Sequence, residues 1–519
     1  MSVSESSPDE TRLSPYGFGQ VRRGLMHFLI GRGTAAVFGF VAAILLVRYL
    51  PIKDYAVFAT LAGLQIVAVA LASFGLDQVI TRFVPMARLR STPAVLVRLI
   101  WTMLAWRVGG LSLVILMLAM LSPWIIELLN ISGFESAYWV MLVYIALFGL
   151  SQHVMRSLQA LMVQRMVKWA QFWEFFSRFV MIAVWSSTHG YEMNVVESIW
   201  ILLACSLLGF LILLTSLVHH LKILIHQEGE WLVMRNDIYR LGWDNYLQTL
   251  LLLPTEVSSL RLIAAYFLAP PAMAAYGFFL TLSSTVRRYL PIQLLLDMAE
   301  PVMLAKYVQS NEFHRLLAMT NFMIKITVYL LAPLIVWVML SGAPMIGFLT
   351  GGKYEEYVWL LSVLLIALLF DSHWIMLRTI CNAVGMSSAL AKGALVSLVG
   401  LVPLLGIISS WPLPEVFVSG ALIFVILQNL IVVKILRGAG HLYTLDWKGL
   451  RRISVAIVMT AGVGWYLLYW INLNGLWETI ASSFVMIAVY LMTARWLQVF
   501  SREEREMLAR INRRLVWVA

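Results

Sequence analysis

Apolar stretches long enough to cross a bilayer recur from one end of the chain to the other. About 20 helical residues cross the hydrocarbon of a membrane, because each residue rises about 1.5 Å along the helix axis. The sequence is 61% apolar and only 13% charged, whereas a soluble domain carries about 25% charged residues. The strands of an outer-membrane barrel are shorter, about ten residues, and alternate in polarity. The sequence therefore predicts an all-α, polytopic membrane protein.

Fourteen spans are expected, each close to the length that a bilayer requires. They cover residues 25–50, 55–75, 96–120, 137–160, 169–187, 198–220, 242–268, 272–296, 319–342, 357–380, 389–409, 414–436, 452–471 and 476–498. The polar residues before the first span are expected to form a cytosolic tail, because Ser, Asp and Glu dominate them.

A short motif occurs twice at the same place relative to the spans. Tyr55–Thr60 returns as Tyr276–Thr281 at an offset of 221 residues, and Leu76-Asp77 returns as Leu296-Asp297 at an offset of 220. Six spans fit within this offset, so spans 1–6 and 7–12 are predicted to be two copies with the same orientation. A parallel duplication of this kind places a binding cavity between two lobes, which is the geometry of alternating access.

The expected organisation is thus two six-helix lobes in parallel repeat plus two extra C-terminal helices. The segments are a cytoplasmic tail, an N-lobe, a cytoplasmic linker, a C-lobe, the extra spans 13 and 14, and a basic cytoplasmic tail. They cover residues 1–24, 25–220, 221–241, 242–436, 437–498 and 499–519, in that order.

Positive charge is concentrated in alternate connections between the spans. Arg82, Arg88 and Arg90 follow span 2, and the other connections on that side are also basic, whereas Arg48, Lys53 and Lys353 are the Lys and Arg residues assigned to the opposite side. The positive-inside rule then predicts that both termini lie in the cytoplasm.

Several charged residues fall inside the spans, where each costs at least about 2.5–3.5 kcal/mol on insertion scales and therefore faces a cavity or another polar group. The candidate substrate-binding cations are Arg32, Arg107, Arg156, Arg178, Arg261 and Lys325. The candidate ion-coupling acids are Glu256, Asp371 and Glu174. Pro254 is expected to loosen the helix beside Glu256. The excess of cations favours an anionic cargo, because guanidinium groups pair bidentately with phosphate oxygens.

Some of these residues have a second interpretation. Glu174 and Arg178 are four residues apart on one helix face, so they are either a structural ion pair or transport groups. Lys325 and Arg287 lie near span ends, from which a long side chain reaches water. The sequence contains no Walker motif and no C-x-x-C pair, and its histidines are dispersed. No metal or other cofactor is expected, and coupling to Na⁺ or H⁺ is the expected energy source.

Short motifs in three places resemble those of a known transporter family. Ser73–Pro85, closing span 2, is similar to the phrase found there in Wzx-type polysaccharide flippases of the multidrug/oligosaccharidyl-lipid/polysaccharide exporter superfamily. Leu349–Tyr354 before span 10 and Ala383–Met386 before span 11 resemble turns of that family, and Pro403 lies in the helix that follows.

The resemblance implies movement of an undecaprenyl-diphosphate-linked oligosaccharide across the bacterial inner membrane, for exopolysaccharide or O-antigen assembly. In such flippases cations of the first lobe line the cavity, and Arg32 fits that pattern by span and depth. The implied partners are the lipid-linked oligosaccharide, membrane lipids, and a polysaccharide polymerase with its export machinery, but no nucleic acid. In its fourteen spans the chain resembles the lipid II flippases, whose last two helices form a lipid-facing groove, and this resemblance implies such a groove for residues 452–498.

Two other functions stay open. A drug or cation exporter of the same superfamily would need an acid-dominated cavity, whereas cations dominate here. A membrane glycosyltransferase or polymerase would need a sizeable extracytoplasmic loop to hold its catalytic groups, and the connections assigned to that side are short. The expected protein is therefore a transporter and not an enzyme.

Overall fold

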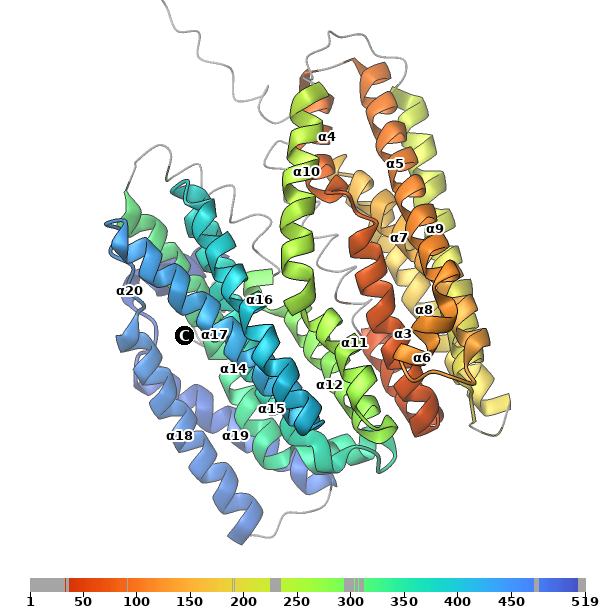
Figure 1. Ribbon diagram of the computed structural model, residues 1–519. Coiled ribbons are helices and arrows are strands. Elements are labelled where there is room, and N and C mark those ends of the chain that lie inside the picture. Colours follow the sequence, from red (N-terminus) through yellow and green to blue (C-terminus); the bar gives the residue numbers. More distant parts are fainter. Residues whose placement is uncertain are drawn as a thin grey trace, which may run out of the picture. The chain divides into compact units, whose positions relative to one another are not determined.

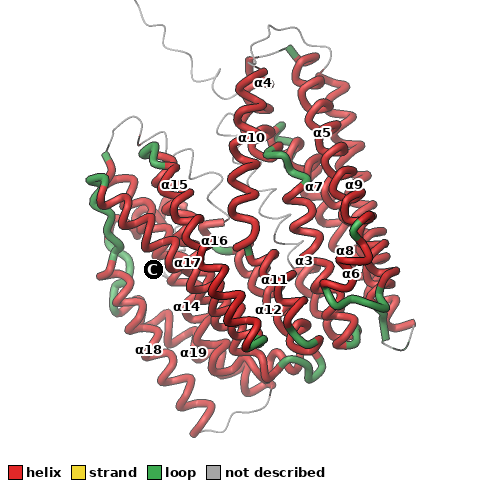
Figure 2. The backbone as a smooth tube through the Cα atoms, in the orientation of Figure 1, coloured by secondary structure: helices red, strands yellow, loops and turns green. Residues whose placement is uncertain are grey.

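A computed structural model describes residues 33, 37–90, 92–188, 190, 192–224, 235–293, 303, 307, 312–470 and 476–511. Within these residues the backbone forms helices joined by turns and loops, with no strand (Figure 2). Eleven of the described helices are long and apolar enough to cross a membrane. The chain is thus an all-helical, multi-pass membrane protein. It divides into two compact units, Met1–Tyr266 and Phe267–Ala519, which we call unit 1 and unit 2.

Unit 1 begins in its described part with a short apolar helix, Val37–Tyr49. The elements that follow are α3 (Ile52–Leu71), α4 (Leu76–Arg90), α5 (Pro93–Met120), α6 (Ser122–Leu128), α7 (Glu135–Ala160), α8 (Gln164–Thr188), α9 (Val195–Leu224), α10 (Arg235–Leu252), the 3₁₀ turn η1 (Leu253–Thr255) and α11 (Val257–Phe267). Proline lies at the start of several helices, including α5 and α6. It is tolerated there because the first helical N–H groups have no partner within the helix.

Two breaks in these helices position polar groups. Between α3 and α4, Phe74 and Gly75 adopt φ values of +45° and +68°, a left-handed conformation that ends one helix before the next begins. Between α10 and α11, Pro254 lies in the 3₁₀ turn, and Glu256 follows with extended backbone (ψ 147°). The loosening of the helix beside Glu256 that the sequence predicts is therefore present as a complete break.

The helix α7 lies among several neighbours within unit 1 (Figure 1). It packs against α3, α4, α5 and α9, and α8 packs mainly against α9. An apolar core lies between α4, α5, α7, α8 and α9, and Ile80, Ile100 and Leu158 in it are fully buried. The helix α10 packs on α4, where a Cβ on Gly75 would lie 2.0 Å from the carbonyl oxygen of Gly242. Only glycine at position 75 permits this approach.

Unit 2 contains α12 (Pro270–Tyr289), α14 (Phe313–Thr350), the 3₁₀ turn η2 (Glu355–Tyr357), α15 (Val358–Ala383), α16 (Ser387–Ser410), α17 (Pro414–Gly438), α18 (Trp447–Trp470), α19 (Leu476–Trp496) and α20 (Arg502–Ile511). Its packing repeats that of unit 1: α15 contacts α12, α14 and α17, and α16 packs mainly against α17. The equivalent helices in unit 1 are α7 with α3, α5 and α9, and then α8 with α9. The predicted duplication is therefore visible as one packing order used twice.

The last two long helices, α18 and α19, pack on each other and on α14 (Figure 1). Phe322 and Tyr329 of α14, Ile453 of α18 and Tyr490 of α19 share one apolar cluster with Phe500. The Tyr490 hydroxyl donates a hydrogen bond of 2.8 Å to the carbonyl oxygen of Tyr329. The extra helix pair is thus an integral part of unit 2.

A helix coincides with the described part of each of the fourteen expected spans. The helices α8 and α12 are not among the eleven candidate spans, and the first span is described only from Val37. The helix α14 has 38 residues, longer than expected. By sequence, the seventh span (α10–η1–α11) is the first span of the second repeat. In the structure its residues up to Tyr266 belong to unit 1. Leu296-Asp297 lies outside the described residues.

Candidate functional site

The structure distributes the candidate residues over both units. Arg107, Arg156, Glu174, Arg178, Glu256 and Arg261 lie in unit 1, and Lys325 and Asp371 lie in unit 2. Arg32 lies outside the described residues. Several of these side chains form ion pairs or hydrogen bonds with other residues of the chain. These contacts show which charges have a structural role.

Arg107 is one of the largest fully buried side chains, with 2% of its surface exposed. Its guanidinium donates to three carbonyl oxygens, those of Ala72 (2.9 Å), Val69 (3.3 Å) and Gly149 (3.4 Å). Ala72 and Val69 are at the C-terminal end of α3, where carbonyl groups lack partners within the helix and the helix dipole attracts a cation. These contacts favour a capping role for Arg107 at the break between α3 and α4.

Arg156, near the end of α7, forms an ion pair with Asp77 in the first turn of α4. The distance between Arg156 Nη1 and Asp77 Oδ2 is 2.8 Å, and the two side chains are 42% and 29% exposed. His153, one turn earlier on α7, is 2% exposed, and neither of its ring nitrogens has a hydrogen-bond partner. The partly exposed Arg156 of this ion pair and the buried ring of His153 therefore lie one turn apart on the same helix.

Glu174 and Arg178 form the ion pair that their spacing predicts. Arg178 Nη2 lies 3.1 Å from Glu174 Oε1, and both side chains are mostly buried. The same oxygen accepts a hydrogen bond of 2.9 Å from the Ser206 hydroxyl on α9. A Cβ on Gly209 would lie 3.0 Å from Glu174 Oε2, so that glycine makes room for the carboxylate. These contacts indicate that the pair holds α8 to α9.

Glu256 and Arg261 lie on either side of the start of α11. Glu256 is exposed at the helix break, and its carbonyl oxygen accepts the first backbone hydrogen bonds of α11, from Ser259 and Leu260. Arg261 is 7% exposed and packs its methylene chain against α3, where a Cβ on Gly63 would meet Arg261 Cδ at 3.0 Å. The exposed carboxylate of Glu256 thus precedes the buried guanidinium of Arg261 by five residues, about one and a half helical turns.

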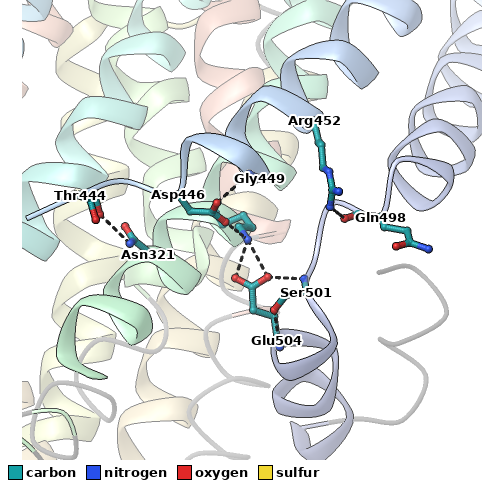
Figure 3. Close-up of polar contacts among 9 residues, drawn as sticks. Asn321, Thr444, Asp446, Gly449, Arg452, Gln498, Ser501 and Glu504 are labelled. Carbon is teal, nitrogen blue, oxygen red and sulfur yellow. Dashed lines mark hydrogen bonds and ion pairs between the residues drawn. The ribbon is translucent and has the colours of Figure 1, made fainter. Parts of the chain in front are cut away.

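Lys325, on α14 in unit 2, is 3% exposed and lies between two carboxylates. It contacts Asp446 before α18, and its Nζ lies 2.7 Å and 2.8 Å from the two carboxylate oxygens of Glu504 on α20. Both acids also act as helix caps, as Figure 3 shows: Asp446 accepts from the Gly449 N–H (3.0 Å) and Glu504 from the Ser501 N–H (2.7 Å). Lys325 therefore joins the N-termini of α18 and α20 to α14.

Asp446 and Glu504 lie outside the candidate spans, whereas Lys325 lies within α14. Partial burial alone would raise the pKa of Asp446, but the hydrogen bonds from Lys325 and from the Gly449 N–H outweigh burial and lower that pKa. A Cβ on Gly449 would lie 2.5 Å from Lys325 Cε, so glycine there permits the lysine to reach both caps.

Asp371 on α15 pairs with Arg287 on α12. The two oxygens of Asp371 lie 2.9 Å and 3.1 Å from Arg287 Nη2. The sequence predicts that Arg287 reaches water from the span end, and the structure instead directs it to this carboxylate. Beside it, the Asn429 amide donates 2.8 Å to the carbonyl oxygen of Phe370. Asp371, one of the three candidate coupling acids, thus forms an ion pair with an arginine of a neighbouring helix.

The sequence does not single out four polar residues that lie at these sites: Asp77, His153, Asp446 and Glu504. Local signals for two of them exist. Ser501–Glu504 has the S-x-x-E pattern of a capping box, and Asp446 stands directly before a helix that begins at Trp447. No local signal pairs either acid with Lys325, because the contact joins segments more than a hundred residues apart. Within the described residues, no group of three or more His, Cys, Asp or Glu side chains is arranged to hold a metal ion.

Comparison with known proteins identifies the fold. No protein-family model matches the sequence, and no curated protein matches it. The lipid II flippase MurJ, in an inward closed conformation, is similar with a TM-score of 0.64 and 15% identity, over 90% of this chain and 97% of that chain. An inward-facing multidrug resistance MATE family transporter of the MOP superfamily is similar with a TM-score of 0.59 and 13% identity, over 81% of this chain and 100% of that chain. The chain has the fold of these membrane transporters.

Proposed function

We propose that this chain is a flippase that carries an undecaprenyl-diphosphate-linked oligosaccharide from the inner to the outer leaflet of the bacterial inner membrane. The helix pair α18–α19, integrated on α14, is the observation that carries the proposal. The likeness to the lipid II flippase extends over 90% of this chain, whereas the whole MATE transporter corresponds to 81% of it. A helix pair beyond the twelve-span repeat suits a cargo with a long lipid tail better than a small drug.

The charge of the spans supports an anionic cargo. Arg107, Arg178 and Lys325 are engaged by carbonyl or carboxylate groups within their units. We assign to the cargo Arg156, whose ion pair with Asp77 is partly exposed, and Arg261, which is buried beside the break between α10 and α11, together with Arg32 of the first span. A diphosphate enters a low-dielectric cavity only where fixed cations replace its hydration, and guanidinium groups do so with two parallel hydrogen bonds.

Transport by alternating access needs an energy source, and we propose coupling to Na⁺ or H⁺. Asp371 and Glu174, the other two candidate acids, form ion pairs with Arg287 and Arg178. Glu256 is exposed at the break between α10 and α11, so we assign the coupling role to it first. We place both termini in the cytoplasm, on the side where the connections are basic. The cargo would serve exopolysaccharide or O-antigen synthesis, with a polysaccharide polymerase and export machinery as partners.

A reconstituted flipping assay tests the proposal. The purified chain in vesicles should expose a fluorescent polyprenyl-diphosphate oligosaccharide of the inner leaflet to a membrane-impermeant quencher, faster than vesicles without protein. Arg156→Met should slow this flipping strongly. Arg98→Met removes one exposed positive charge at the start of α5 and should leave the rate unchanged, which separates a specific contact from net charge.

Two outcomes would contradict the proposal. Efflux of a cationic dye such as ethidium, without flipping of the lipid-linked oligosaccharide, would assign the chain to drug export. Incorporation of sugar from a nucleotide sugar into lipid, again without flipping, would make it an enzyme.

A further inference from the structure

We propose that Asp77 occupies the place of the cargo's phosphate in the empty protein, and that the incoming anion takes Arg156 from it. This inference rests on the proposed function and specifies how an anionic cargo is first bound in unit 1. The site consists of Asp77 at the start of α4, Arg156 and His153 on α7, and Arg107 behind them on α5.

The ion pair between Asp77 and Arg156 is partly exposed. The two side chains are 29% and 42% exposed, and the distance between Arg156 Nη1 and Asp77 Oδ2 is 2.8 Å. A guanidinium has five N–H donors in a fork that matches a phosphate or a carboxylate with two bonds. Arg156 forms no other ion pair or hydrogen bond within the described residues. Most of its donors are therefore left for a second anion.

The surroundings of the pair attract negative charge. The helix α4 begins at Leu76, directly after the break at Phe74 and Gly75, so its N-terminal N–H groups and dipole point toward this region. Arg107 caps the end of α3 at the same break and interacts electrostatically with both Asp77 and Arg156. The two arginines and one aspartate leave a net charge of about +1 beside a helix N-terminus. One carboxylate does not neutralise this site.

His153 supplies an independent sign of a missing partner. It lies three residues before Arg156 on α7, so the two side chains share a helix face. Its ring is 2% exposed, and neither nitrogen has a hydrogen-bond partner. Buried polar groups without partners are rare and call for an explanation such as a bound ligand. An imidazole ring carries at least one N–H, so His153 can donate to a phosphate oxygen bound next to Arg156.

An exchange of anions keeps Arg156 paired throughout the cycle. Arg156 is partly exposed and always charged, and in the empty protein Asp77 is its counter-ion. A phosphate group can accept two parallel hydrogen bonds from the guanidinium and a third from His153, so it displaces the carboxylate. When the cargo leaves, Asp77 closes on Arg156 again, and this competition promotes release.

Binding of farnesyl diphosphate to the purified full-length chain in nanodiscs tests the exchange. Asp77→Asn removes the competing charge but keeps the shape, so its affinity should rise about twofold to fivefold, the worth of a partly exposed ion pair. Asp77→Glu should bind like the unchanged protein. Arg156→Met should lose at least about tenfold in affinity, and the double variant should behave like Arg156→Met. Glu127→Gln removes an exposed acid of the same unit and should have no effect.

Flipping kinetics give the second readout. Asp77→Asn should lower KM and also lower kcat, because tighter binding without a returning carboxylate slows release. An affinity for Asp77→Asn that equals or falls below that of the unchanged protein would overturn the exchange, provided that thermal unfolding shows both to be folded. If the unchanged protein flips lipid-linked oligosaccharide and Asp77→Asn has unchanged affinity, the exchange alone is wrong. If the unchanged protein does not flip it at all, the proposed function itself fails.

Discussion

Removal of the Lys325 charge tests whether this residue holds the C-terminal helices in place or binds cargo. Lys325→Met keeps an unbranched chain of similar length but leaves Asp446 and Glu504 facing each other without their cation. Breaking a fully buried ion pair from one side costs about 3–5 kcal/mol. Here the two acids are 31% and 13% exposed, and each lies at a helix N-terminus that favours a carboxylate by about 0.3–1 kcal/mol. We therefore expect a loss of about 2–3 kcal/mol in the stability of the α18–α20 attachment.

Hydrogen exchange of the α20 amides measures this loss locally, which suits a large membrane protein whose global unfolding is not two-state. A loss of about 2–3 kcal/mol corresponds to about 30- to 160-fold faster exchange through local opening, at 1.36 kcal/mol per factor of ten. The triple variant Lys325→Met/Asp446→Asn/Glu504→Gln removes all three charges and should recover much of the protection, because neutral groups of the same shape carry no unpaired charge.

Two results would refute this reasoning. Unchanged α20 exchange in Lys325→Met would show that the charge does not hold the helix. A triple variant as unprotected as the single one would show that the loss is one of packing and not of charge. If flipping is lost in Lys325→Met while α20 keeps its protection, Lys325 is a cargo contact, as the sequence alone suggests.

The remaining predictions concern the breaks in unit 1 and the pH dependence of the α18 cap. Arg107→Ala should lower the free energy of unfolding by about 2–4 kcal/mol, because three carbonyl oxygens lose a charged donor. The amount of protein in the membrane and its melting temperature measure this loss. A normal amount of protein with selective loss of flipping would contradict the capping role. Gly75→Ala should be strongly destabilising because Gly75 has a φ of +68° and lies close to α10. A Cβ on Gly109 would have no atom within 4 Å, so Gly109→Ala should stabilise α5 by about 0.5–1 kcal/mol in thermal unfolding. Equal melting temperatures of the two variants would refute the difference. The folded-state pKa of Asp446 is lowered, so its stabilisation of the α18–α20 attachment is present above the unfolded pKa of about 3.9 and is lost as the pH falls through the folded value. Hydrogen exchange of the α20 amides should accelerate over that pH range, less steeply in Asp446→Asn. An identical pH profile in the two proteins would contradict this. Glu256→Gln should weaken the dependence of flipping on a Na⁺ or H⁺ gradient while thermal unfolding stays unchanged, and an unaltered gradient dependence would transfer the coupling role to Asp371 or Glu174.

The order of the helices is a property that the sequence by itself determined. Hydropathy reports how much apolar area a segment must bury, and this quantity is local, so each expected span coincides with a helix. The repeat of Tyr55–Thr60 at Tyr276–Thr281 likewise predicts the packing order that α3, α5, α7 and α9 share with α12, α14, α15 and α17. Local spacing was also sufficient for the Glu174–Arg178 pair, because four residues make one helix turn.

Only the tertiary structure decided which of the buried charges have partners. Hydropathy gives the depth of a residue in a span but not the direction of its side chain around the helix axis. Arg107 and Lys325 are both candidate cargo cations by sequence, yet one caps α3 and the other joins α14 to α18 and α20. The partners of Lys325 are 121 and 179 residues away in sequence. Their meeting depends on how helices pack, because a charge in a low-dielectric interior is stabilised by whatever group the fold brings within about 3 Å of it.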